Sequence, residues 1–170
     1  MEFIEVIKNR YACKKFDGRQ VEKQQLDAIL EAGRLAPTAK NLQEQHIYVI
    51  QSKEGLAKVD QVTPCRYGAE TALVVAFDKT NVFTYPGEKR ESGVEDASIV
   101  ATHLMLAAQA EGVDSCWINF FDPEIMAKEL GLPENEEVLM MLDLGYAAKG
   151  IKALPTHTQR KEIGETVTYM

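Results

Sequence analysis

The chain has 170 residues, 45% of them hydrophobic and 26% charged, which suits one soluble domain spanning residues 1–170. A formal net charge of -7 argues against nucleic acid or an anionic membrane as the main partner, and no apolar run has the length of a signal peptide or membrane span. Three widely spaced cysteines without a CxxC pair argue against disulfides and zinc and favour a reducing, cytoplasmic setting.

Helices and strands alternate through the first half of the chain. Hydrophobic spacing and turn residues predict a helix over 2–9, a helix over 22–35 that Pro37 stops, a strand over 46–50, a helix capped by Ser52, and a buried strand over 72–78. A long polar loop over 79–92 follows, and its length favours a working loop over a simple connector.

The second half continues the alternation. We expect a helix over 94–111 that ends at Gly112, a strand in "SCWINF", a helix from Asp122 to Leu130 closed by Gly131, a strand over 137–146, and a tail with a strand-like "ETVTYM". The helix over 94–111 is apolar almost all round, which is typical of a central helix or a subunit interface. Together these elements predict an α+β or α/β sandwich.

The common catalytic and nucleotide-binding motifs are missing. The sequence contains no GxGxxG after a strand, no GxxxxGK[ST], no HExxH and no GxSxG. Cys13 lies beside two lysines, which could lower its thiol pKa, but a buried structural cysteine is the favoured interpretation because no histidine is near in sequence. If the protein is an enzyme, we expect a bound cofactor to carry the chemistry.

Basic residues gather near both ends of the chain. In "NRYACKKF", Arg10, Ala12 and Lys14 alternate, so an extended backbone would point the two cations to one side with a small residue between them. Arg160 lies in the polar tail segment "THTQRKE". Such cations suit a phosphate group. The alternative is a solvated basic surface at both places.

The small-residue turn over 37–41 lies between a predicted helix and a predicted strand. With the two basic segments it could clamp a phosphate-bearing ring system, and the amide of Asn41 could contact a polar ring edge. The plainer interpretation is that Pro37 stops a helix and Asn41 is an ordinary turn residue.

Taken in order, these segments resemble the FMN-dependent nitroreductase family. The likeness begins with "NRYACKKF" and "LAPTAKNLQ" and continues through the helix over 94–111, "SCWINFFDPE", "LGLPENEEV", "LGYA" and the late Arg160. It covers essentially the whole chain, and it rests on the order and spacing of the motifs rather than on any one of them.

The resemblance implies an α+β three-layer sandwich, in which a mostly antiparallel sheet is flanked by helices, and an intertwined homodimer with two FMN sites at its interface. It assigns flavin contacts to four parts of the chain: Arg10, Tyr11, Ala12 and Lys14; Pro37, Thr38, Ala39 and Asn41, reaching across from the partner subunit; Cys116, Trp117 and Ile118 near the flavin ring; and Arg160 at the phosphate. No side chain is assigned a catalytic role. For Trp117, a plain core position is the competing interpretation.

The sequence departs from the family pattern at two places. Ala12 stands where the family often has serine, so a hydroxyl contact to FMN worth about 0.5–1.5 kcal/mol would be missing. Glu44 and Gln45 replace the more usual proline and aromatic residue, which changes the edge of the expected pocket.

The implied activity is reduction of nitroaromatics, quinones or related acceptors by NADH or NADPH, with hydride passing through flavin N5. Two alternatives stay open at this point. One is a flavin-binding or storage protein without turnover. The other is a relative specialised for reductive dehalogenation or flavin fragmentation, for which the loop over 79–92 is the one candidate substrate cover.

Overall fold

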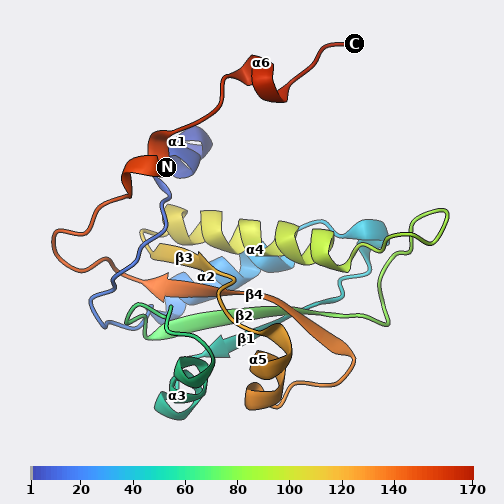
Figure 1. The fold of residues 1–170 in the computed structure, drawn as a ribbon. Coiled ribbons are helices and arrows are strands. Elements are labelled where there is room, and N and C mark those ends of the chain that lie inside the picture. The colour runs from blue at the N-terminus through green and yellow to red at the C-terminus, as the bar shows by residue number, and fades with distance from the viewer. Residues whose placement is uncertain (1) are drawn as a thin grey trace.

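A four-stranded antiparallel sheet forms the middle of the computed structural model, which describes residues 2–170 (Figure 1). The strand order is β1-β2-β4-β3, so the edge strands are β1 and β3. Antiparallel pairing joins each neighbouring pair, with an irregularity in register between Val75 and Ala76. The strands are β1 (Gln45–Ile50), β2 (Thr71–Asp78), β3 (Asp114–Ile118) and β4 (Glu136–Gly145).

Helices cover both faces of this sheet. The pair α2 and α4 lies on one face, and α3 and α5 lie on the other (Figure 1). The fold is therefore an α+β sandwich of three layers, which confirms the predicted class. The helical elements are α1 (Phe3–Asn9), α2 (Lys23–Arg34), η1 (Ala39–Asn41), α3 (Lys53–Val62), α4 (Gly93–Ala110), α5 (Pro123–Leu130), η2 (Pro155–Thr158) and α6 (Ile163–Thr166).

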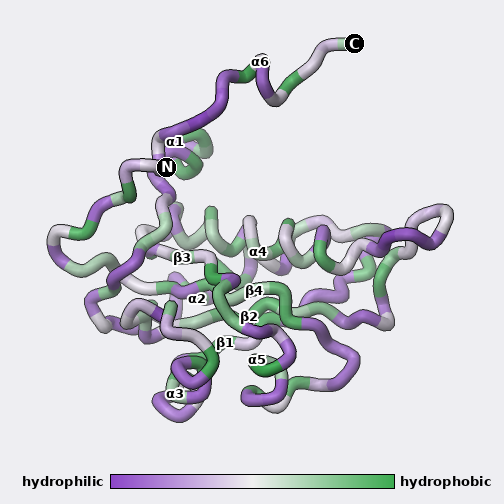
Figure 2. Tube along the Cα trace, viewed as in Figure 1, coloured by the Kyte–Doolittle hydropathy of each residue, from purple (hydrophilic) through white to green (hydrophobic). Residues whose placement is uncertain are grey.

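The central strand β2 divides the core into two halves. Successive side chains of a strand point to opposite faces, so β2 feeds both helical layers. Leu73, Val75 and Phe77 pack toward α2 and α4, while Ala72, Val74 and Ala76 pack toward α3 and α5. Figure 2 shows hydrophobic stretches along β2 and β4, as expected for strands covered on both sides. Gly33 brings α2 close to α4, because a Cβ there would lie 2.6 Å from Leu104 Cδ2.

The predicted helix ends are confirmed. The Ser52 hydroxyl accepts the Gly55 backbone N–H at 3.0 Å, and the Asp122 carboxylate accepts two N–H groups of α5. Gly112 and Gly131 follow α4 and α5 with φ of 73° and 70°, which is the left-handed conformation that glycine adopts at little cost.

The prediction of a strand in "ETVTYM" is wrong. Its first residues belong to α6, and residues 167–170 are exposed and pair with no strand among residues 2–170. A local contact favours the helical turn, since the Glu162 backbone N–H donates to Glu165 Oε2 at 2.9 Å. The tail leaves the three layers and carries α6 away from the sheet (Figure 1). Within the described residues, no helix is long and apolar enough to cross a membrane.

Candidate functional site

The first basic segment lies extended along the edge of β3. Ala12 forms a parallel bridge with Ser115, and the Cys13 N–H donates to Ser115 O at 2.9 Å. Cys13 and Phe16 are buried, while Ala12 and Lys14 are exposed. The alternation expected from the sequence is therefore present, and it leaves the small residue and the following cation on the surface.

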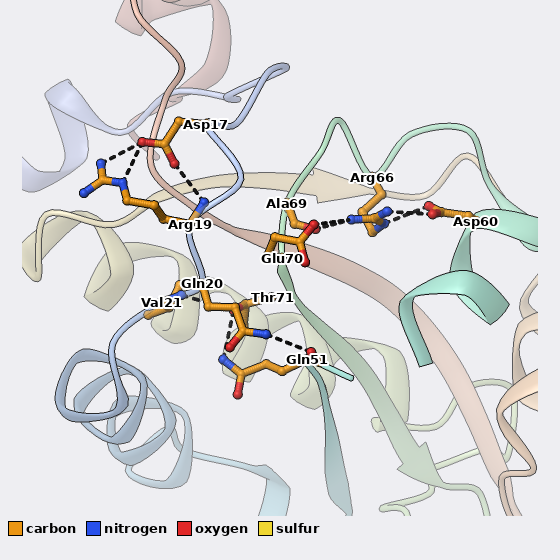
Figure 3. A network of polar contacts seen from close by, with 10 residues as sticks. All are labelled: Asp17, Arg19, Gln20, Val21, Gln51, Asp60, Arg66, Ala69, Glu70 and Thr71. Atoms are coloured by element: carbon orange, nitrogen blue, oxygen red, sulfur yellow. Dashed lines mark hydrogen bonds and ion pairs between the residues drawn. The ribbon is translucent and has the colours of Figure 1, made fainter. Parts of the chain in front are cut away.

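A polar network fixes the segment that follows (Figure 3). The Val21 N–H and the Gln51 amide both donate to Thr71 Oγ1, at 3.3 and 3.0 Å, and the Gln20 amide donates to Gln51 O at 2.8 Å. Arg19 pairs with Asp17 at 2.7 Å beside them. These bonds tie the end of the N-terminal segment to β1 and β2, and so hold the basic residues in register with the sheet.

A pocket of about 230 Å³ lies where the two basic segments meet, and we refer to it as the basic pocket. It contains Arg10 from the end of α1 and Arg160 from the tail, two residues far apart in the sequence. The basic pocket is lined by Arg10, Tyr11, Ala12, Leu154, Thr156, His157 and Arg160. Leu154, Thr156 and His157 were missed by the sequence analysis, because a short polar tail has no periodic pattern that marks its inward residues.

The two arginines of the basic pocket carry uncompensated charge. Neither Arg10 nor Arg160 forms an ion pair with an acidic side chain of residues 2–170. Arg160 donates instead to the carbonyl oxygens of His157 and Gln159, both at 2.6 Å, and His157 Nε2 bonds Lys8 O at 3.1 Å. Burial raises the pKa of Tyr11, so its hydroxyl stays neutral and can donate a hydrogen bond.

The other residues assigned on β3 and beside it are distributed over three places. Lys14 does not line the basic pocket, and its Nζ lies 5.9 Å from the centre of the Tyr67 ring. Cys116 and Ile118 are buried toward α3 and α5. Trp117 is half-buried, packs toward the α2 and α4 core, and bonds the Asn119 side chain through Nε1. A role in core packing thus explains the buried part of the Trp117 side chain.

The position of Cys13 favours a structural role. It is fully buried, and burial raises its thiol pKa. The alternative of a lysine-activated thiol is therefore wrong, because the cost of placing a thiolate in the core outweighs the exposed lysines beside it. Burial likewise raises the pKa of Cys116 to about 12. All three cysteines are free thiols.

The turn over 37–41 is held by contacts from distant parts of the chain. Pro37 follows the end of α2, and the next residues form η1. The Ala39 N–H donates to Asp96 Oδ1 at 3.0 Å, and the Gln43 N–H donates to Thr38 Oγ1 at 3.0 Å. The turn is thereby attached to the first turn of α4, a connection that its own sequence does not reveal.

The backbone of this turn is unusual for residues with side chains. Lys40, Asn41 and Gln43 have φ between 51° and 55°, a region that non-glycine residues seldom occupy. Asn41 is exposed, so its amide is available to a ligand or partner. A strained and anchored turn of this kind is typical of a functional position.

The turn and the basic pocket lie apart within one chain. The turn is near the N-terminal end of α4, whereas α1 and the tail lie near its C-terminal end (Figure 1). The resemblance implies that this turn reaches a flavin site from a partner subunit, and the separation within this chain is compatible with that expectation. One chain therefore brings together only some residues of the candidate site. Arg10, Tyr11, Ala12 and Arg160 line the basic pocket, whereas the turn over 37–41 does not.

A larger hollow of about 1220 Å³ lies elsewhere, between α5 and the start of β4. Its charged residues are mainly acidic, which disfavours a phosphate-bearing ligand. They are Asp122, Glu124, Glu134, Glu136 and Glu137, together with Lys79 and Lys128.

Comparison with known proteins identifies relatives along most of the chain. A model of the nitroreductase family matches residues 7–65 and 64–146. A protein of Archaeoglobus fulgidus, provisionally named NADH dehydrogenase/NAD(P)H nitroreductase, is 31% identical over 156 residues, which are 85% of each chain. A crystal structure of a nitroreductase family protein from Clostridium difficile 630 has a TM-score of 0.93 and 38% identity, covering 99% of this chain and 98% of that one. An FMN-dependent nitroreductase from Clostridium difficile R20291 has a TM-score of 0.79 and 28% identity, covering 98% of each.

Proposed function

Because the chain belongs to the nitroreductase family, we propose that it is an FMN-dependent oxidoreductase that uses NADH or NADPH to reduce nitroaromatics, quinones or related acceptors. The observation that carries the proposal is the basic pocket, in which Arg10 and Arg160 face one small cavity and form no ion pair with an acidic side chain of the described residues 2–170. The FMN-dependence of the Clostridium difficile R20291 relative supports the choice of cofactor.

The chemistry of the basic pocket fits one end of FMN. Two guanidinium groups can each offer paired N–H donors to a phosphate, and the exposed Ala12 leaves space beside them. The volume of about 230 Å³ is smaller than the roughly 300–1,000 Å³ typical of pockets that enclose a whole ligand of this size. The basic pocket would therefore hold the phosphate end, and the ring would need a further wall.

A second copy of the chain would supply that wall. Within one chain, the turn over 37–41 lies near one end of α4, whereas α1 and the tail, whose residues line the basic pocket, lie near the other end (Figure 1). Exposed apolar residues on α1 and on the outer side of α4 offer a surface for a partner subunit. They are Phe3, Ile4, Ile7, Val94 and Ile99. In the homodimer that we propose, each FMN site combines one basic pocket with the partner's turn.

When bound, FMN would supply hydride transfer through N5 between the nicotinamide and the acceptor, which side chains cannot do. The chain's share is binding and orientation. Arg10 and Arg160 would hold the phosphate, Lys14 would favour negative charge near the ring, and backbone N–H groups of β3 near Trp117 would lie close to N5. No side chain is required as a catalytic acid or base. We place the enzyme in the cytoplasm as a single FMN-binding domain.

The test is a visible spectrum of the purified protein, followed by mass spectrometry of the released ligand. We expect a yellow protein that releases FMN, loses its colour with NADH or NADPH under anaerobic conditions, and oxidises the nicotinamide steadily when a nitroaromatic or quinone is added. A colourless protein that does not bind added FMN would refute the cofactor assignment. Tight FMN binding without nicotinamide oxidation would refute the reductase and favour storage.

A further inference from the structure

Two carboxyl groups are buried together beneath the turn over 37–41. Glu44 precedes β1, Asp96 lies in the first turn of α4, and each is only 4% exposed. One oxygen of each has a partner. Asp96 Oδ1 accepts the Ala39 N–H at 3.0 Å, and Glu44 Oε1 accepts the Ser92 hydroxyl at 3.4 Å.

A proton between the two carboxyl groups would satisfy the remaining two oxygens. Glu44 Oε2 and Asp96 Oδ2 are buried and have no hydrogen-bond donor among residues 2–170. Ionised carboxylates can only accept, so two of them cannot bond, whereas one protonated carboxyl can donate to the other. Burial, and then the contact with Asp96, raise the pKa of Glu44 to about 7.

The other charged groups around the pair are engaged elsewhere. Lys40 lies over the Phe83 ring at 4.7 Å, and Arg90 pairs with Glu95 at 3.1 Å. Glu91 accepts the Gly93 N–H, and the Asp78 side chain accepts from Thr80 at 2.8 Å. The N-terminus of α4 favours one negative charge at this position. One charge and one proton are therefore the combination that the surroundings support.

We propose that Glu44 and Asp96 share one proton and act as positioning residues, which hold the turn over 37–41 in its binding shape until that proton is lost. The flavin-contacting role of the turn rests on the proposed function, whereas the attachment of the turn to the pair does not. Glu44 stands at one of the two places where the sequence departs from the family pattern.

Loss of the proton places two negative charges side by side in the core. Their repulsion is relieved when one carboxylate turns outward, and release of Asp96 breaks its bond to the Ala39 N–H. The turn then loses the contact that balances its positive-φ residues and relaxes. Because the folded-state pKa of Glu44 is raised above the ordinary value of a glutamate, this order is present at low pH and is lost as pH rises through about 7.

The test is hydrogen exchange at the Ala39 amide in the ligand-free protein, measured from pH 6 to pH 8.5 and corrected for the intrinsic rate. Above the Glu44 pKa of about 7, protection should fall by about tenfold per pH unit. In Glu44→Gln, the amide donates to Asp96 at every pH, so protection should stay high throughout. The control is Glu95→Gln, an adjacent and more exposed acid, which should keep the wild-type profile.

Infrared spectroscopy gives a second reading. Between pH 6 and pH 8, the buried Asp143 carboxyl, with its pKa of about 9, stays largely protonated. The wild-type difference spectrum over this range should therefore contain a carboxylic-acid C=O band that Glu44→Gln lacks. A wild-type protection that ignores pH, or a Glu44→Gln profile identical to wild type, would overturn the proposal. FMN titration over the same pH range separates the two ideas. Exchange that follows the pair in a protein that does not bind FMN would leave the proton sharing intact and refute only the proposed function.

Discussion

The two ends of α4 differ in how firmly they hold the residues beside them. At its N-terminal end, the turn over 37–41 is fixed by a hydrogen bond from the Ala39 backbone N–H to the buried side chain of Asp96. Near its C-terminal end, Arg10 and Arg160 face the basic pocket and have no acidic partner in the part of the chain that the structure describes, and the tail that carries Arg160 is largely exposed. It follows that the turn has its shape before a ligand arrives, whereas the basic pocket keeps charge that a phosphate would neutralise.

The largest effect is expected where the charge is uncompensated. Arg10→Ala and Arg160→Ala should each weaken FMN binding by about 10- to 150-fold, because each removes a charge-assisted hydrogen bond of about 1.5–3 kcal/mol. Fluorescence titration of FMN measures the effect. Lys161→Ala, which changes the neighbouring cation outside the pocket lining, is the matched control and should bind like wild type. Equal affinity in all four proteins would remove the phosphate assignment.

Mixed dimers test whether the two ends of α4 serve one site across the interface. Arg160→Ala damages the basic pocket, and Asn41→Gly removes the turn amide but keeps the backbone freedom that φ of 55° requires. In a dimer with one subunit of each kind, a site shared between subunits gives one undamaged and one doubly damaged site. We expect half of the sites to recover wild-type affinity. No recovery would mean that pocket and turn act within one chain.

The sequence predicted the local features of this fold better than the long-range contacts. Caps such as Ser52 and Asp122, and the glycine ends of α4 and α5, depend on adjacent residues and were found directly. The link from Ala39 to Asp96 spans 57 positions and has no sequence signature. The tail strand was mispredicted because a strand needs a partner, and alternation alone does not say whether one exists.

The residues of the basic pocket were predicted less completely than the local features and more completely than the long-range contacts. Arg10 and Arg160 were expected at a phosphate because the resemblance placed them there, and they do line one pocket. His157 lies in the same polar segment as Arg160 but was not singled out, because its contact with Lys8 O depends on the path of the tail. Charge can be read from a sequence, whereas the direction of an exposed segment cannot.

A third buried carboxyl shows how burial changes a pKa when no hydrogen-bond partner is present. Asp143 in β4 is fully buried, neither of its oxygens has a hydrogen bond within residues 2–170, and burial raises its pKa to about 9. The unfolded chain releases this proton at the ordinary, much lower pKa of an aspartate, so the free energy of unfolding should fall as pH rises from that value to about 9. Asp143→Asn should flatten that decline and gain about 1–3 kcal/mol at pH 8.

Urea unfolding at pH 6 and pH 8 measures this effect. Glu137→Gln, on the same strand but exposed, should keep the wild-type slope. A slope in Asp143→Asn as steep as that of wild type would assign the decline to another group, with the Glu44 and Asp96 pair the first to test. Both Asp143 and the pair of Glu44 and Asp96 should lower the free energy of unfolding as pH rises. Hydrogen exchange at the Ala39 amide is therefore needed to distinguish the effect at the turn from the effect in the core.

The smallest effect is expected from adding a contact to the basic pocket. Ala12 is exposed beside Arg10, so Ala12→Ser places a hydroxyl in the pocket without disturbing the bridge to Ser115, which uses the backbone. One neutral hydrogen bond contributes about 0.5–1.5 kcal/mol, which corresponds to FMN affinity about 2- to 12-fold tighter. Titration beside Ala12→Cys, which is close to serine in shape but has only a weak S–H donor, separates the hydrogen bond from altered packing. If both variants bind FMN with the same affinity, or more weakly than wild type, residue 12 does not contact the cofactor. The pocket would then bind the phosphate through its arginines alone.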